Sequence, residues 1–117
     1  MADSILRKKS KQFARDIVFL CRSLKQRGSE GALTSQLLRS GTSIGANIHE
    51  AQYAHGPKDF ISKLEIALKE CGETEYWLEL LRDVGSLSES ELQAYSDACL
   101  ELRRMLVSSV TTLKNKI

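Results

Sequence analysis

Residues 57–85 read PKDFISKLEIALKECGETEYWLELLRDVG, and this stretch decides the fold. Its apolar and small residues recur four and three positions apart, at Phe60, Leu64, Ala67, Cys71, Thr74, Leu78 and Leu81. A repeat of this heptad type gathers its members on one side of an α-helix, where a neighbouring helix can cover them. Pro57 suits a first helical turn and Gly85 suits a helix end. The stretch therefore predicts one long amphipathic helix over residues 57–84.

Three further segments carry apolar residues at helical spacing and predict helices over about 4–27, 32–54 and 89–116. The last has the clearest start, because Ser88 and Glu91 form a capping box flanked by Leu87 and Leu92. Only a few residues separate successive segments, and short links between long helices make neighbours antiparallel. The sequence shows no strand pattern. We expect a single all-α domain over residues 1–117, an antiparallel up-down-up-down four-helix bundle.

The composition is that of a globular protein, with 42% hydrophobic and 27% charged residues. No apolar run approaches the ~20 residues that a membrane span needs, and the N-terminus lacks the apolar core of a signal peptide. The three cysteines fall on apolar stripes, where we expect buried thiols, and their odd number fits a reducing compartment. A cytoplasmic protein without membrane contact is the expectation.

The charge is unevenly distributed, and the first thirty residues carry eight Lys or Arg against three Asp or Glu. Five of these cations recur on one face of the first predicted helix, opposite its apolar stripe: Lys8, Lys11, Arg15, Arg22 and Lys25. We call them the basic row. Such a row can neutralise several phosphates without reading base sequence. No aromatic residue is expected to interleave with it, so single-strand stacking is not supported. An ordinary solvated helix face is the other interpretation.

The stretch SGTSIGANIHEA at residues 40–51 concentrates small residues inside a predicted helix, although each interior glycine costs about 1 kcal/mol relative to alanine. Gly41 and Gly45 open one helix face, which lets another backbone or a large side chain such as Trp77 approach closely. We expect a subunit interface that contains this face and the surplus apolar residues of the third helix: Gly41, Ile44, Gly45, Tyr76, Trp77 and Leu80. A nucleotide-binding loop is the weaker alternative, since the stretch has no GK[ST] and joins no strand to a helix.

Few groups suggest catalysis. His49 and His55 are six residues apart and do not share a helix face, and the Glu-x-x-His pairs of a di-iron bundle are missing. Glutamates cluster in the third segment without histidine at ligand spacing. We expect no catalytic residue, no metal and no cofactor. Asn47 and Glu50 lie beside the apolar stripe, where they are either a structural polar pair or a contact to a ligand.

Two stretches, RSGTSIGANIHEAQYA and KDFISKLEIALKECGETEYWLELL, resemble the four-helix-bundle proteins encoded in 23S rRNA intervening sequences. The matching residues are Arg39, Ser40, Ser43, Ile44, Ala46, Asn47, Ile48, Glu50, Phe60, Leu64, Ile66 and Ala67. The resemblance covers about residues 5–115 and departs at Ala51, where many members have glycine. The family is similar in fold to the accessory protein of diversity-generating retroelements, a basic pentameric barrel that binds nucleic acid and a reverse transcriptase. The resemblance therefore implies a homopentamer.

Two functions are compatible with these patterns. The leading hypothesis is a non-enzymatic oligomeric scaffold that binds nucleic acid, RNA rather than DNA, through the basic row. The alternative is a protein–protein adaptor whose charged faces serve subunit assembly or partner recognition. A metal-dependent bundle enzyme is a third class, disfavoured because ligand patterns are missing.

Overall fold

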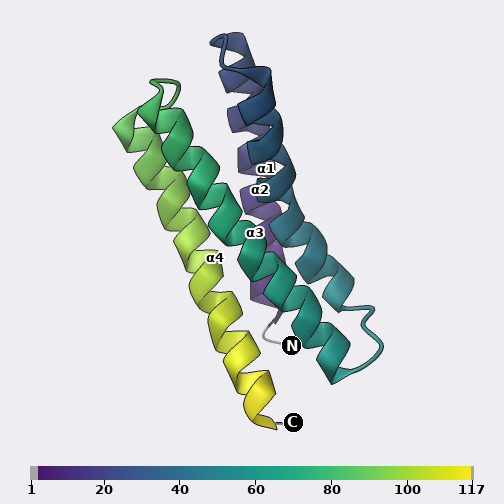
Figure 1. Cartoon of the computed structure of the whole chain (residues 1–117). Helices are drawn as coiled ribbons and strands as arrows, with labels where there is room; N and C mark the ends of the chain where they lie inside the picture. The colour runs from purple at the N-terminus through teal and green to yellow at the C-terminus, as the bar shows by residue number, and fades with distance from the viewer. Residues whose placement is uncertain (1–2, 117) are drawn as a thin grey trace.

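The computed structural model describes residues 3–116, and these residues form four long helices connected by short turns (Figure 1). The helices are α1 (Asp3–Gln26), α2 (Gly31–Ala51), α3 (Pro57–Asp83) and α4 (Glu89–Lys116). Successive helices run in opposite directions, up, down, up and down, and residues 3–116 contain no strand. The bundle measures 47 × 21 × 19 Å. The predicted fold class is confirmed.

Two glycines end helices where the sequence predicts. Gly28 and Gly85 follow α1 and α3 with φ of +82° and +86°, a left-handed conformation that glycine adopts without a side-chain clash. The residue after each glycine donates its N–H to a carbonyl in the last turn, from Ser29 to Leu24 at 3.0 Å and from Ser86 to Leu81 at 2.8 Å. Each helix end thus has bonded carbonyls and a sharp change of direction.

The second helix is shorter than predicted. It ends at Ala51 rather than at residue 54, because the chain turns away to reach the start of α3. Gln52 and Tyr53 donate to carbonyls three residues back, at 3.2 and 2.9 Å, which marks a tight last turn. The N–H of His55 then bonds the Asp59 carboxylate at 3.0 Å. The link therefore consists of residues 52–56. The apolar pattern alone assigned residues 52–54 to the helix.

The capping box of α4 is confirmed. The Ser88 hydroxyl accepts the N–H of Glu91 at 3.1 Å, and the Glu91 carboxylate accepts the N–H of Ser88 at 2.9 Å. Leu87 and Leu92 are both buried beside this reciprocal pair. The two leucines hold the chain against the core at the point where α4 begins.

The core confirms the repeat in α3, whose six residues from Leu64 to Leu81 are buried while Phe60 is partly buried. The packing follows the order of the chain: α2 lies extensively against α1 and α3, and α3 against α4, whereas α1 and α4 touch only lightly. Two ion pairs cross this lighter seam, Lys9–Glu101 at 3.1 Å and Arg27–Glu91 at 2.6 Å. The surfaces of α1 and α2 thus remain accessible along most of their outer sides.

The glycine face of α2 packs inside the chain, which corrects the prediction that it meets a second subunit. A Cβ on Gly41 would lie 2.9 Å from two carbons of Ile17, and one on Gly45 would lie 3.2 Å from the Ser10 carbonyl oxygen. Both contacts are to α1, and Gly41 and Ile44 are buried within the single chain. The small residues therefore let α1 and α2 approach closely, and Trp77 does not occupy this face.

Candidate nucleic-acid interface

All five cations of the basic row are exposed on α1. None of them forms an ion pair with a carboxylate of residues 5–116, whose side chains the structure describes. Arg15 instead donates a hydrogen bond to the neutral Gln12 side chain at 2.6 Å. Lys8 to Lys25 spans seventeen residues, or about 25 Å of helix. The row is a line of cations without ion pairs, interrupted between Arg15 and Arg22.

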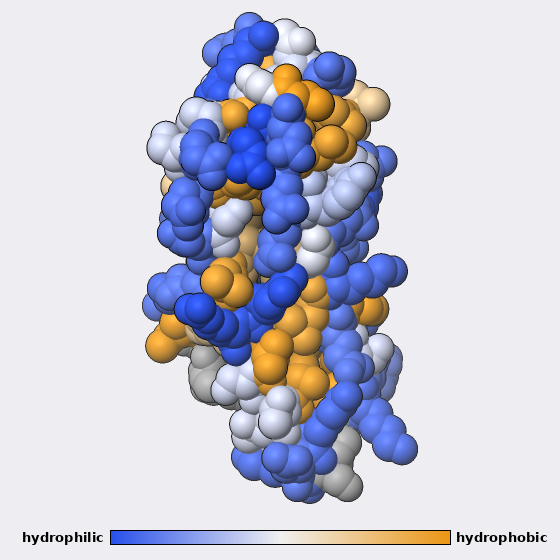
Figure 2. All heavy atoms as spheres, turned by 60° about the vertical axis from the view of Figure 1, so that its left-hand side comes forward, coloured by the Kyte–Doolittle hydropathy of each residue, from blue (hydrophilic) through white to orange (hydrophobic). Residues whose placement is uncertain are grey.

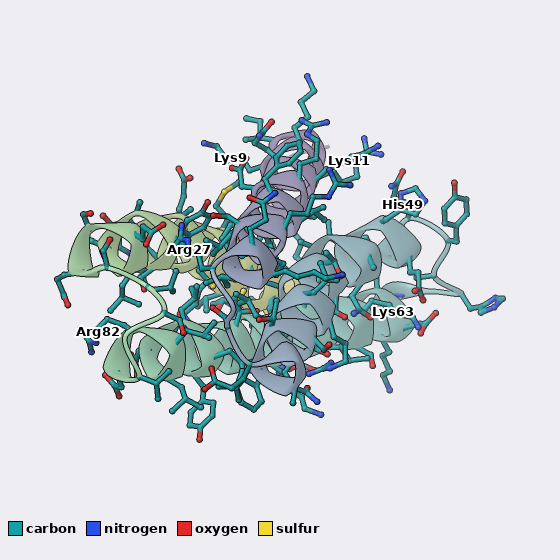
Figure 3. The ribbon with its side chains drawn as sticks, turned by 90° about the horizontal axis from the view of Figure 1, so that it is seen from above. Lys9, Lys11, Arg27, His49, Lys63 and Arg82 are labelled. Atoms are coloured by element: carbon teal, nitrogen blue, oxygen red, sulfur yellow. The ribbon has the colours of Figure 1, made fainter. Side chains whose placement is uncertain are left out.

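Two cations outside the row, Lys9 of α1 and Arg27 in the turn after it, have carboxylate partners, whereas Arg7 bonds the neutral Gln52 side chain. Lys9 pairs with Glu101 and Arg27 with Glu91, both across the seam to α4. Figure 3 shows Lys9 and Lys11 on opposite sides of α1, with Lys11 on the side of α2. The helix thus divides its charges: one side stabilises the bundle, and the other presents cations to solvent.

Two shallow grooves run along the outer seam between α1 and α2. One, of about 480 Å³, has Lys8 and Lys11 on its α1 wall and His49 on its α2 wall. The other, of about 560 Å³, has Arg22 and Lys25 on the α1 wall and Leu38 opposite. Small residues of both helices line them, including Ala14, Gly45 and Ala46 in the first and Ser35 in the second. Four cations of the row therefore border concave surface.

An aromatic residue lies beside the row, contrary to the sequence-based expectation. Phe19 is 60% exposed, and the Arg22 guanidinium lies 5.6 Å from the centre of its ring. Phe19 falls four residues after Arg15 and three before Arg22, so it neighbours both cations on the helix surface. The prediction that no aromatic residue interleaves with the basic row is wrong. A wheel plot that separates Phe19 from the buried Phe13 would have found this residue.

Tyr76, Trp77 and Leu80, the residues of α3 predicted to meet another subunit, differ in exposure, and Trp77 is partly buried against the core. Tyr76 is 58% exposed and packs edge-on against Trp77, with ring centres 5.0 Å apart. The Trp77 indole donates to Glu73 at 3.2 Å, and Leu80 is half-buried. Val84 extends the same face and is 52% exposed. Figure 2, which brings the α4 side of the molecule forward, likewise shows apolar patches among hydrophilic side chains.

The described residues offer little for catalysis. No group of three or more His, Cys, Asp or Glu among residues 3–116 is placed to hold a metal ion. The cysteines are free and buried, and burial raises the pKa of the Cys21 thiol to about 11. The pKa of Cys99 is also raised, first by its hydrogen bonding with Cys71 and then by burial. The thiols of Cys21 and Cys99 are therefore held protonated. Across residues 3–116, no helix is long and apolar enough to cross a membrane.

Comparison with known proteins gives the chain a family. The sequence model described as "23S rRNA-intervening sequence protein" matches residues 2–108. The chain belongs to this family. The 23S rRNA-intervening sequence family thus accounts for the resemblance seen in the sequence.

A solved structure supports the same assignment. It is a crystal structure of a protein with unknown function from the S23 ribosomal protein family of Bacteroides thetaiotaomicron. That protein is similar to this chain with 43% identity and a TM-score of 0.92, over 95% of this chain and 99% of the other. A comparison with curated proteins finds no match.

In this member of the 23S rRNA-intervening sequence family, two residues of the matching stretch, Arg39 and Ser40, join α2 to α3. Arg39 bonds Glu70 at 3.4 Å and also pairs with Glu73. The buried Thr74 hydroxyl lies 3.0 Å from that of Ser40. Arg39 thus neutralises part of the glutamate cluster of α3.

Asn47 and Glu50 do not bond each other. The Asn47 amide donates to the Ser43 carbonyl at 2.9 Å on its own helix, and Glu50 accepts from Lys63 of α3 at 3.4 Å. Both contacts are structural ones, within α2 and between α2 and α3. The structure therefore favours the structural interpretation of these two polar residues, and the candidate interface is the one on α1.

Proposed function

We propose that this protein is a non-enzymatic oligomeric scaffold that binds RNA through the basic row of α1. The observation that carries the proposal is the division of charge along α1 and the turn that follows it. Lys9 and Arg27 have carboxylate partners on α4. The five cations of the row form no ion pair with any carboxylate of residues 5–116. Exposed cations on a rigid helix suit a backbone of phosphates, because each contact releases a condensed counterion. The proposal includes a cytoplasmic location, which the free cysteines support.

Salt dependence tests the proposal directly. The probe is a fluorescein-labelled structured RNA, titrated by anisotropy at about 50 and 200 mM salt. If five phosphates are contacted, affinity falls about 100- to 500-fold between these concentrations. Arg15→Glu with Arg22→Glu is expected to abolish most of the binding. The control is Lys58→Glu with Arg104→Glu, two exposed cations on other helices that change the net charge equally. Equal binding by both double variants would contradict the assignment to α1.

Assembly is part of the proposal. The outer face of α3, with Tyr76, Trp77, Leu80 and Val84, is the proposed contact between subunits, and five is the number that the family resemblance implies. Aromatic residues are enriched in such contacts. Repeating the basic row around an oligomer would multiply weak phosphate contacts. Sedimentation of the protein and of Tyr76→Glu with Val84→Glu checks this: the wild type is expected to be oligomeric and the variant monomeric with unchanged helicity.

The adaptor function is favoured by the same α3 face, since an exposed aromatic surface also suits a different protein. A pulldown that recovers one stoichiometric protein, resists nuclease treatment and is lost in the α3 variant would support the adaptor. Recovery of RNA that depends on Arg15 and Arg22 would support the scaffold.

A further inference from the structure

The ring of Phe19 adds an exposed aromatic face to the basic row, and phosphate binding does not require such a face. It is 60% exposed although a phenylalanine gains free energy from burial, and it lies on the outer surface of α1 rather than at a helix–helix seam. Arg22 lies against it, so a cation and an aromatic face are presented together. A planar base can stack on either group.

A second exposed ring lies near the Lys8 end of the row. Tyr53 follows α2, is 73% exposed, and its ring centre is 5.7 Å from that of His49. His49 in turn lines the groove that Lys8 and Lys11 border. The line of cations therefore has one exposed ring within it, Phe19, and another, Tyr53, near its Lys8 end.

Duplex RNA would not use these rings. Its bases are stacked on each other inside the helix, and its surface offers phosphates and 2′-hydroxyls. Unpaired bases can turn out of the strand and cover an aromatic face while the backbone follows the cations. The combination of rings and cations matches the second kind of ligand.

We infer that the nucleic acid bound by α1 is single-stranded, with its phosphates along the basic row and an unpaired base stacked on Phe19 beside Arg22. This inference rests on the proposed function and narrows it to unpaired RNA segments such as loops and ends. The shallow grooves beside Lys8, Lys11, Arg22 and Lys25 provide room for the flanking nucleotides.

The test compares a labelled, non-self-complementary RNA of about 12 nucleotides with the same strand annealed to its complement. Phe19→Ala is expected to weaken single-strand binding about tenfold and duplex binding less than twofold. For this variant, the slope of log affinity against log salt concentration with the single strand should equal that of the wild type, because no charge is removed. Phe19→Trp should keep the affinity, whereas Phe19→Leu, which retains apolar bulk without a π-face, should lose it. Val107→Ala, at an exposed apolar residue of α4, is the control.

The possible failures are distinguishable. If Arg15→Glu with Arg22→Glu abolishes binding while the Phe19 variants bind like the wild type, the stacking inference is wrong and the proposed function stands. If Phe19→Ala changes sedimentation and weakens single strand and duplex equally, Phe19 is a subunit contact and the inference is overturned. If neither RNA binds at 50 mM salt, both proposals fail.

Discussion

A methyl group on Gly41 would lie 2.9 Å from both Cγ1 and Cγ2 of Ile17, a side chain fully buried in α1. Ile17 is β-branched and has little rotamer freedom on a helix, so it cannot move aside cheaply. The glycine therefore sets how closely α1 and α2 approach. Because the outer seam of these helices borders the basic row, this spacing also shapes the proposed binding surface.

We expect Gly41→Ala to destabilise the protein by about 1 kcal/mol, since overpacking outweighs the gain in helix propensity. Urea denaturation measures the change. The matched control is Gly72→Ala in α3, where the nearest atom to the new Cβ is the end of the flexible Arg103 side chain at 3.7 Å. This variant should be stabilised by up to about 1 kcal/mol. Stabilisation by both substitutions would show that Ile17 accommodates the methyl group.

The pair Arg27–Glu91 should make stability depend on pH. The hydrogen bond from Arg27, followed by that from the Ser88 N–H, lowers the pKa of Glu91 from 4.5 to about 2. Because the folded-state pKa is lowered, the contribution is complete above about pH 4.5 and is lost as pH falls towards 2. Glu91→Gln should therefore cost about 1 kcal/mol at pH 7 and almost nothing near pH 2. Urea denaturation at several pH values checks this, and a constant difference would contradict the assignment.

The buried hydroxyls of Ser40 and Thr74 should be energetically coupled. They lie 3.0 Å apart between α2 and α3, and each is fully buried. Ser40→Ala and Thr74→Val should each cost about 1 kcal/mol, because each leaves a partner hydroxyl less well bonded. The double variant should cost clearly less than the sum. A double-mutant cycle in urea gives the coupling, and strict additivity would mean that the contact contributes nothing.

Individual lysines of α1 should differ in their effect on RNA binding. Lys11→Gln and Lys25→Gln should each reduce the salt slope by about 0.7 to 0.9, because each removes one phosphate contact. Lys9→Gln is the matched variant on the same helix and should leave the slope unchanged, since Lys9 pairs with Glu101. Anisotropy titrations at four or more salt concentrations give the slopes. An equal reduction by Lys9→Gln would show that the paired side also binds.

The fold could be predicted from the sequence because its signals are local. The repeat from Phe60 to Leu81, the capping box at Ser88 and the glycines after α1 and α3 each act within a few residues. The end of α2 was missed because apolar spacing continues through Ala54, while the turn to Pro57 is determined by where the next helix must start.

The candidate site was only half predictable. The periodicity of the basic row places its cations on one face without knowledge of the neighbours. Which cations are paired depends on α4. Glu101, the partner of Lys9, lies about ninety residues further along the chain. The same holds for Gly41, whose partner Ile17 lies on another helix. Phe19 is a different case. Its position on the helix alone indicates exposure, so the sequence contained the signal and the prediction overlooked it.

The light contact between α1 and α4 bears on how the chain reaches its native state. Since the extensive interfaces join helices that are consecutive in the chain, helical hairpins can form with short loop closures before the ends of the bundle meet. Topologies of this kind fold in microseconds to milliseconds. Contact between α1 and α4 closes the longest loop and gains the least packing. The backbone amides of the residues at this seam should therefore be among the first to exchange with solvent deuterium.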